Sequence, residues 1–211
     1  MTGGVPDAQA GEKALAAVRV GRDAPLMPDL ITPRLRVHPI DPAEGERIRA
    51  RHRGPGDTWA DDFPADGDVA GVSAYLRATA QLGEQQPFGY YRVTRSADGL
   101  AIGGAGFKGQ PRGGRVEIGY GLSPSARGQG YAAEVVVALM SVAAAHALST
   151  VFAQTTDDNI ASQRTLIRAG FHPVAAVGEL RCYEAVLTPE GSWVPAADAP
   201  SSPPDGRATG R

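Results

Sequence analysis

A six-residue segment, Arg127–Ala132, constrains the fold of this 211-residue chain more than any other. Before it stands a strand-like run, Arg115–Leu122, in which apolar residues alternate with others, and after it Ala133–Leu148 contains no Gly or Pro and favours a helix. A strand, a short glycine loop and a helix in that order gather backbone N–H groups at the start of the helix. Because these groups have no acceptor within the helix and carry a partial positive charge, the segment predicts an anion-binding loop.

The glycines of this loop strengthen the prediction but do not decide it alone. Gly128 and Gly130 leave the backbone without Cβ atoms where an anion would approach, and Arg127 adds a full positive charge where the loop begins. Glycines also occur in ordinary tight turns between a strand and a helix. The loop by itself therefore leaves both interpretations open.

A second glycine motif, Gly104–Gly109, matches the dinucleotide-binding pattern by letter. That pattern requires a helix directly after it, but Pro111 and two further glycines follow here. We therefore interpret these glycines as strand residues that allow close packing of the backbone.

Composition argues against several classes of protein. The chain has 21 basic and 23 acidic residues and a net charge of −2, so charge offers no basis for binding nucleic acid. The lone cysteine, Cys182, leaves no partner for an internal disulfide and no cysteine-rich metal site. No apolar run approaches the ~20 residues that span a bilayer. We expect a cytoplasmic protein with no metal, no nucleic-acid partner and no membrane association.

The chain divides into a structured middle and two polar ends. Residues 1–28 are expected to form a flexible tail with one short helix around Glu12–Val20, and residues 189–211 a disordered tail rich in Pro, Ser and Ala. The domain is expected over 29–188. Helices are predicted over Pro42–His52, Val69–Leu82, Ala133–Leu148 and Ile160–Ala169. Strands are predicted over Leu35–Pro39, Phe88–Thr94, Leu100–Phe107, Arg115–Leu122, Val151–Thr155, His172–Val177 and Leu180–Val186.

The motifs in this order resemble those of the GNAT acyl-CoA N-acetyltransferases over residues 30–187. Arg127, Gly130 and Ala132 match the (Arg/Gln)-x-x-Gly-x-(Gly/Ala) loop of that family, and Asn159–Ser162 with Ala169–Phe171 match its Asn-x-x-Ser and Gly-Phe segments. The runs 31–37 and 117–120 resemble the RimJ/RimL-type branch, which acetylates protein N-termini and related amines. The resemblance implies an α+β fold with a mixed, mostly antiparallel sheet of six to seven strands, about four helices and a splayed parallel strand pair at its centre.

The resemblance also implies acetyl-CoA as the cofactor. Its pyrophosphate is expected on the N–H groups of the glycine loop, and its pantetheine arm between strands that splay at about 119–122 and 151–155. The N–H of Tyr120 is expected to polarise the thioester carbonyl, with a bulge there between Gly119 and Gly121. Asn159 is expected to contact the pantetheine or the end of the splayed strand, or to cap the following helix, and these roles are compatible. The expected cofactor-binding residues are Tyr120, Gly121, Leu122, Arg127, Gly128, Gln129, Gly130, Tyr131, Ala132, Asn159 and Ser162.

The expected catalytic residues are Glu117, Tyr120 and Ser162. Glu117 is a candidate base, with an exposed strand carboxylate as the alternative. Many GNAT enzymes carry a proton-donating tyrosine at the position of Leu166, so that route is absent here. Ser162 lies one turn before Leu166 and offers a relay through water, unless the thiolate departs unprotonated.

The sequence leaves the acceptor amine open. A pocket is expected between the first two helices and the last hairpin. Five aspartates near Trp59 and Phe63 suit a cationic amine, although such a group in a loop is more often simply solvated: Asp57, Asp61, Asp62, Asp66 and Asp68. The leading function is acetylation of a protein or peptide N-terminus by a monomer or homodimer. The alternatives are acetylation of a small amine and a catalytically silent CoA-binding domain.

Overall fold

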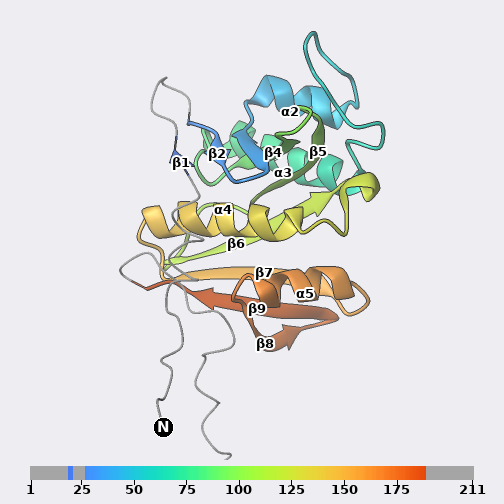
Figure 1. The fold of residues 1–211 in the computed structure, drawn as a ribbon. Helices are drawn as coiled ribbons and strands as arrows, with labels where there is room; N and C mark the ends of the chain where they lie inside the picture. The colour runs from blue at the N-terminus through green and yellow to red at the C-terminus, as the bar shows by residue number, and fades with distance from the viewer. Residues whose placement is uncertain (1–18, 21–26, 189–211) are drawn as a thin grey trace, which may run out of the picture.

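The structure, a computed structural model, describes residues 19–20 and 27–188 and contains one mixed sheet with helices packed on it (Figure 1). The helices are α2 (Pro42–Arg49), α3 (Asp66–Leu82), α4 (Tyr131–Ala145), α5 (Ile160–Arg168) and the short 3₁₀ helix η1 (Pro124–Ala126). The strands are β1 (Arg19–Val20), β2 (Leu30–Ile31), β3 (Leu35–Pro39), β4 (Tyr90–Arg95), β5 (Ala101–Phe107), β6 (Arg115–Leu122), β7 (Thr150–Thr156), β8 (His172–Val177) and β9 (Leu180–Val186).

The sheet has the order β1-β2-β3-β4-β5-β6-β7-β9-β8, and only the neighbours β6 and β7 run parallel among the described strands. This confirms the α+β fold with a central parallel pair. The strand number exceeds the expected six to seven because the two-residue strands β1 and β2 extend one edge.

The expected helix around Glu12–Val20 is wrong at its end, where Arg19 and Val20 form β1 and pair with β2. The remainder of that helix lies outside the described residues, as do nearly all of the expected tails, 1–28 and 189–211. The limits of the domain therefore stay predictions.

Local sequence signals set where the helices begin. Asp41 caps α2 by accepting a hydrogen bond from the Glu44 N–H at 2.7 Å, and Pro42 takes the first helical position, where it loses no hydrogen bond. The helix ends at Arg49, three residues before the expected end. Such cap signals act within one turn, which explains why the sequence alone locates them.

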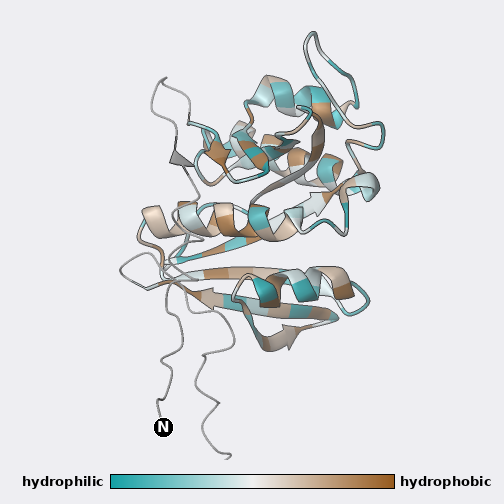
Figure 2. Cartoon of the chain, viewed as in Figure 1, coloured by the Kyte–Doolittle hydropathy of each residue, from teal (hydrophilic) through white to brown (hydrophobic). Residues whose placement is uncertain are grey.

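The helices differ in how deeply they pack. α4 packs on β3 and β6 and buries eight of its residues, whereas α5 packs on β7 and α4 and buries only Leu166. Figure 2 shows the difference, since hydrophobic colours dominate α4 and α5 mixes both kinds. None of the helices in the described part of the chain is long and apolar enough to cross a membrane.

The glycines of β5 allow its neighbours to approach closely. A Cβ atom on Gly103 would lie 2.3 Å from the Gly121 carbonyl oxygen, and one on Gly106 would lie 2.6 Å from that of Gly89. All seven residues of β5 are buried. The interpretation of Gly104–Gly109 as packing glycines, rather than a dinucleotide site, is therefore confirmed for the glycines of the strand.

We predict that Gly103→Ala destabilises the protein, because its Cβ would push against the backbone of β6. Overpacking of a buried site costs about 1–3 kcal/mol. The matched control is Gly67→Ala in α3, where a Cβ meets nothing within 4 Å. Alanine is the better helix former, so the control should equal or exceed the wild type in thermal unfolding. Equal melting temperatures for the two variants would contradict the packing account.

Candidate active site

The central parallel strands separate halfway along their length. β6 and β7 pair only from Arg115 and Thr150 to Ile118 and Ala153. Beyond that point β6 stays on β5, and β7 stays on β9, to their ends. Figure 1 shows the two strands adjacent where they begin and diverging toward their C-terminal ends. The separated segments are thus 119–122 and 154–156, since 151–153 remain paired.

The separation leaves backbone groups of β6 turned toward open space. Lys108 N–H donates to the Glu117 carbonyl at 2.8 Å, and Ser123 N–H donates to Ile102 at 2.8 Å, so odd-numbered residues of β6 face β5. By alternation the backbone groups of Tyr120 and Leu122 face β7, which no longer pairs with them, and the Leu122 carbonyl accepts a hydrogen bond from Arg127 Nε at 2.9 Å instead. The expected bulge at Tyr120 is wrong, because the β5–β6 register is uninterrupted from Ile118 to Leu122.

The glycine loop leads directly into α4, as predicted. Gly128 and Gly130 have φ values of +76° and +80°. In this left-handed conformation the backbone of residues other than Gly, Asn and Asp is strained. Gly130 is the residue before the first turn of α4, and no side chain caps that turn. The first N–H groups of the helix are therefore available to an anion.

Side chains from the segment between β2 and β3, about 100 residues earlier in the chain, hold this loop in place. Arg34 Nη1 donates to the Gln129 carbonyl at 2.9 Å, and the guanidinium lies 4.6 Å from the centre of the Tyr131 ring. Arg34 also forms an ion pair with Glu134, whose second oxygen accepts from Thr32 Oγ1 at 2.7 Å. No local pattern predicts this contact, because it joins residues about 100 positions apart.

Two cavities meet at the separated strands. One, of about 640 Å³, lies between α3 and strands β4–β7, and the other, of about 670 Å³, lies between the glycine loop and α5. Four residues line both cavities: Tyr120, Gly121, Asn159 and Ser162. Ligands in the two cavities would therefore share these four residues as a common wall.

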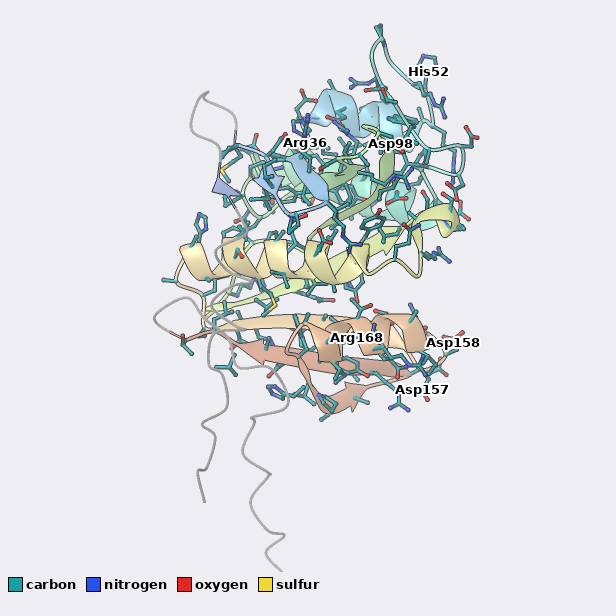
Figure 3. All side chains as sticks on the ribbon, viewed as in Figure 1. Arg36, His52, Asp98, Asp157, Asp158 and Arg168 are labelled. Carbon is teal, nitrogen blue, oxygen red and sulfur yellow. The ribbon has the colours of Figure 1, made fainter. Side chains whose placement is uncertain are left out.

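The second cavity, here called the loop cavity, is lined by all but one of the predicted cofactor-binding residues. The exception is Gln129, whose carbonyl is bound by Arg34. Arg164 and Arg168 on α5 add positive charge, and the acidic Asp158 also lines the cavity. Figure 3 labels Arg168 at the end of this helix and Asp158, which lies just before the helix begins. Arg164 and Arg168 were not among the predicted binding residues, although their spacing of four residues places both side chains on one helix face.

Tyr120 and Ser162 bond each other where the cavities meet. Their hydroxyl oxygens lie 2.9 Å apart, and burial, the main cause, raises the pKa of Tyr120 to about 12. The phenol therefore stays protonated at neutral pH. Asn159 accepts the Ser162 N–H at 3.1 Å, which confirms that it caps α5, and it also lines both cavities. Leu166, at the position of the missing tyrosine, is fully buried.

Glu117 lies apart from this group. Its carboxylate accepts a hydrogen bond from Lys108 Nζ at 2.6 Å, and it lines neither cavity, whereas Lys108 lines the first. The structure thus brings Tyr120, Asn159 and Ser162 together but not Glu117.

The first cavity, here called the α3 cavity, differs from the expected amine pocket. Its walls come from α3, from Gln85–Tyr90 and from β5–β7, and neither α2 nor the β8–β9 hairpin contributes a residue. Gly104, Gly106, Gly119 and Gly121 form part of its lining, so the absence of side chains helps to leave it open.

Comparison with known proteins identifies a family. Residues 34–172 match the family described as Acetyltransferase (GNAT) domain. An uncharacterised N-acetyltransferase, YjdG of Bacillus subtilis (strain 168), is 38% identical over 72 residues, which is 33% of this chain and 43% of that protein. The match thus spans less than half of the length of this relative.

Solved structures share the fold at low identity. An acetyltransferase from Agrobacterium tumefaciens (strain C58) has a TM-score of 0.54 and 24% identity, covering 78% of this chain and 98% of its own. RimL, a ribosomal L7/L12 α-N-protein acetyltransferase solved with coenzyme A, has a TM-score of 0.53 and 16% identity, covering 74% and 95% respectively.

We predict that Arg34→Ala weakens binding of coenzyme A, because the glycine loop loses its hydrogen bond and its contact with Tyr131. Loss of one charged hydrogen bond costs about 1.5–3 kcal/mol, or roughly 10- to 100-fold in Kd, if the whole cost appears in binding. Isothermal titration measures Kd, with Arg36→Ala as the control on the neighbouring strand. Unchanged affinity in Arg34→Ala would show that the loop holds its shape without this residue.

Proposed function

Because the chain belongs to the GNAT acetyltransferase family, we propose that it transfers an acetyl group from acetyl-CoA to the α-amino group of a protein or peptide. The observation that supports this most is the meeting of two cavities at Tyr120, Gly121, Asn159 and Ser162. One cavity has the features of an anion site, and the other gives an amine access to the same four residues. Two-substrate transfer needs such a junction, because the reacting groups must approach within about 3–3.5 Å.

The residues of the loop cavity fit acetyl-CoA. The uncapped start of α4 and the positive φ of Gly128 and Gly130 suit a pyrophosphate, and Arg164 and Arg168 suit a further phosphate. The N–H and carbonyl groups of Tyr120 and the N–H of Leu122 suit the amides of a pantetheine arm, which would add to β6 as a strand does. The Leu122 carbonyl already accepts a hydrogen bond from Arg127 Nε at 2.9 Å. Bound acetyl-CoA supplies the activated acetyl group and the thiolate that leaves.

Tyr120 would act through its backbone and its phenol. Its N–H, turned toward the strand gap, is a hydrogen-bond donor for the oxygen on which negative charge develops. The phenol, held by Ser162, can donate to the departing sulfur. Full proton transfer from a pKa of about 12 to a thiol of pKa ~8.5 costs roughly 5 kcal/mol, so we infer that the phenol stabilises the thiolate and water protonates it later.

An α-amino group is the favoured acceptor because it needs the least help from a base. With a pKa of ~7.7–8, about 9–17 % of it is neutral at pH 7, against about 0.04 % for lysine. RimL, which shares the fold, is an α-N-protein acetyltransferase, and the proposed acceptor is of the same class.

A direct test measures CoA release with acetyl-CoA and a panel of amines. The panel contains peptides with free α-amino groups, the same peptides with blocked N-termini and an internal lysine, and spermidine. We expect turnover on free N-termini and little on the blocked peptides. Preference for spermidine would support acetylation of a small amine. Cofactor binding without turnover on any amine would support a catalytically silent CoA-binding domain.

We predict that Gly130→Asp abolishes the rise in melting temperature that acetyl-CoA gives the wild type. A ligand at 100 times its Kd stabilises by about 2.7 kcal/mol, and a carboxylate at this position would repel the pyrophosphate. Gly130→Asn is the matched control, since Asn has the same shape and also tolerates a positive φ. An equal shift in both variants would place the cofactor elsewhere.

We also predict that Tyr120→Phe and Ser162→Ala each lower kcat while the Kd of acetyl-CoA changes little. Loss of one hydrogen bond that acts on developing charge costs roughly 10²–10³-fold, and loss of Ser162, which only holds the phenol, should cost less. Steady-state kinetics and titration separate the two effects. A larger loss in Ser162→Ala than in Tyr120→Phe would make the serine the direct donor.

A further inference from the structure

One of the five aspartates near the start of α3 differs from the others. Four bond groups outside the α3 cavity: Asp57 with Arg47, Asp61 with Arg53, Asp62 with Ser125 and Asp66 with Arg51. Asp68 is only 2% exposed and lines the α3 cavity. The aromatic residues between them, Trp59 and Phe63, are buried against each other in the core.

The Asp68 carboxylate has hydrogen bonds but no cation. It accepts from the Ala65 N–H at 2.9 Å and from the Tyr90 hydroxyl at 3.2 Å, and it forms no salt bridge with any described residue. Arg51 and Arg127 act on it only at longer range. Burial of a charged carboxylate without a paired cation is unfavourable in free energy. A ligand that supplies a positive charge or a proton to the carboxylate removes this penalty.

The position of this carboxylate is fixed close to the separated strands. Tyr90 lies between Gly71 and Gly104, where added Cβ atoms would come within 2.7 Å and 2.0 Å of its side chain. Gly104 pairs with Gly121, the neighbour of Tyr120, across the β5–β6 ladder. The Tyr90 hydroxyl, which donates to Asp68, therefore lies against β5, the strand next to Tyr120 and Gly121 of β6.

We propose that Asp68 binds the ammonium group of a cationic primary amine in the α3 cavity and takes one of its protons. The N–H bond breaks, the proton moves to the carboxylate oxygen, and the nitrogen keeps its electron pair for attack. Tyr90 orients the carboxylate. The proposal deepens the proposed function and rests on it: the substrate class is an alkylammonium, and Asp68 is the base that Glu117 is not placed to be.

The acidity of Asp68 fits this role. Burial, the largest cause, raises the pKa of Asp68 above its ordinary value, against the opposing effects of the two hydrogen bonds. A raised pKa makes the carboxylate a better base near neutral pH. It also means that the charged form destabilises the fold: stability from the protonated form is present below the unfolded pKa and is lost as the pH rises through the folded one.

The experiment compares Asp68→Asn with Asp66→Asn in the full-length protein. Both variants change one charge in the first turn of α3, but only Asp68 lines the cavity. Asparagine at position 68 can still accept from the Ala65 N–H, and its NH2 group can donate to the Tyr90 hydroxyl, so the second hydrogen bond is kept with its direction reversed. Acetyl-CoA and the best peptide of the wild-type panel are the substrates. Kinetics are measured from pH 6 to 9.5 together with the melting temperature at pH 7.

We expect Asp68→Asn to lower kcat/KM on the order of 10²-fold at pH 7, with the deficit shrinking toward pH 9 as the amine becomes neutral without a base. Its melting temperature should equal or exceed that of the wild type, and Asp66→Asn should keep the wild-type pH profile. A lower melting temperature with a constant deficit across pH would show that Asp68 only caps α3 and would overturn the proposal. Wild-type kinetics in Asp68→Asn would overturn it while leaving the proposed function intact, whereas a wild type without turnover would refute the proposed function itself.

Discussion

The separation of β6 from β7 after Ile118 and Ala153 is the constraint on which the rest of the site depends. If the two strands stayed paired to their ends, the backbone groups of Tyr120 and Leu122 that face β7 would form hydrogen bonds within the sheet. The two cavities would then have no common wall. Each strand keeps its other neighbour, so the sheet tolerates the gap without losing its continuity. Backbone N–H and carbonyl groups that have no partner within the sheet are thus available to a ligand.

Around this gap, distant parts of the chain each supply one element of the site. The start of α4 offers N–H groups, but a single helix end contributes only about 0.3–2 kcal/mol to an anion. Arg34, between β2 and β3, contacts Gln129, Tyr131 and Glu134 and so holds the loop in one conformation before a ligand binds. Tyr120 and Ser162 form a bonded pair across the gap between β6 and α5. The buried Asp68 approaches from α3, on the side where an amine would enter.

Signals that act within a few residues were readable from the sequence, and contacts across the sheet were not. The glycine loop, the cap of α5 at Asn159 and the strand role of Gly104 all follow from local patterns, and the structure has them as expected. The prediction of a bulge at Tyr120 was wrong because glycines in a strand can mark either a bulge or close packing of the backbone. Only the β5–β6 register distinguishes the two. Likewise, nothing in five clustered aspartates marks Asp68, because burial depends on Tyr90, which lies 22 positions away.

Hydrogen exchange with and without acetyl-CoA tests the central claim most directly, because it reads the backbone of the gap itself. If the cofactor adds to the free edge of β6, the amides of Tyr120 and Leu122 and those of Gly130–Ala132 should exchange more slowly when it is bound. The amides of Val116 and Ile118, already turned toward β7 where the strands pair, should not change. Protection confined to the loop, or no protection at Tyr120 and Leu122 at saturating cofactor, would contradict the account.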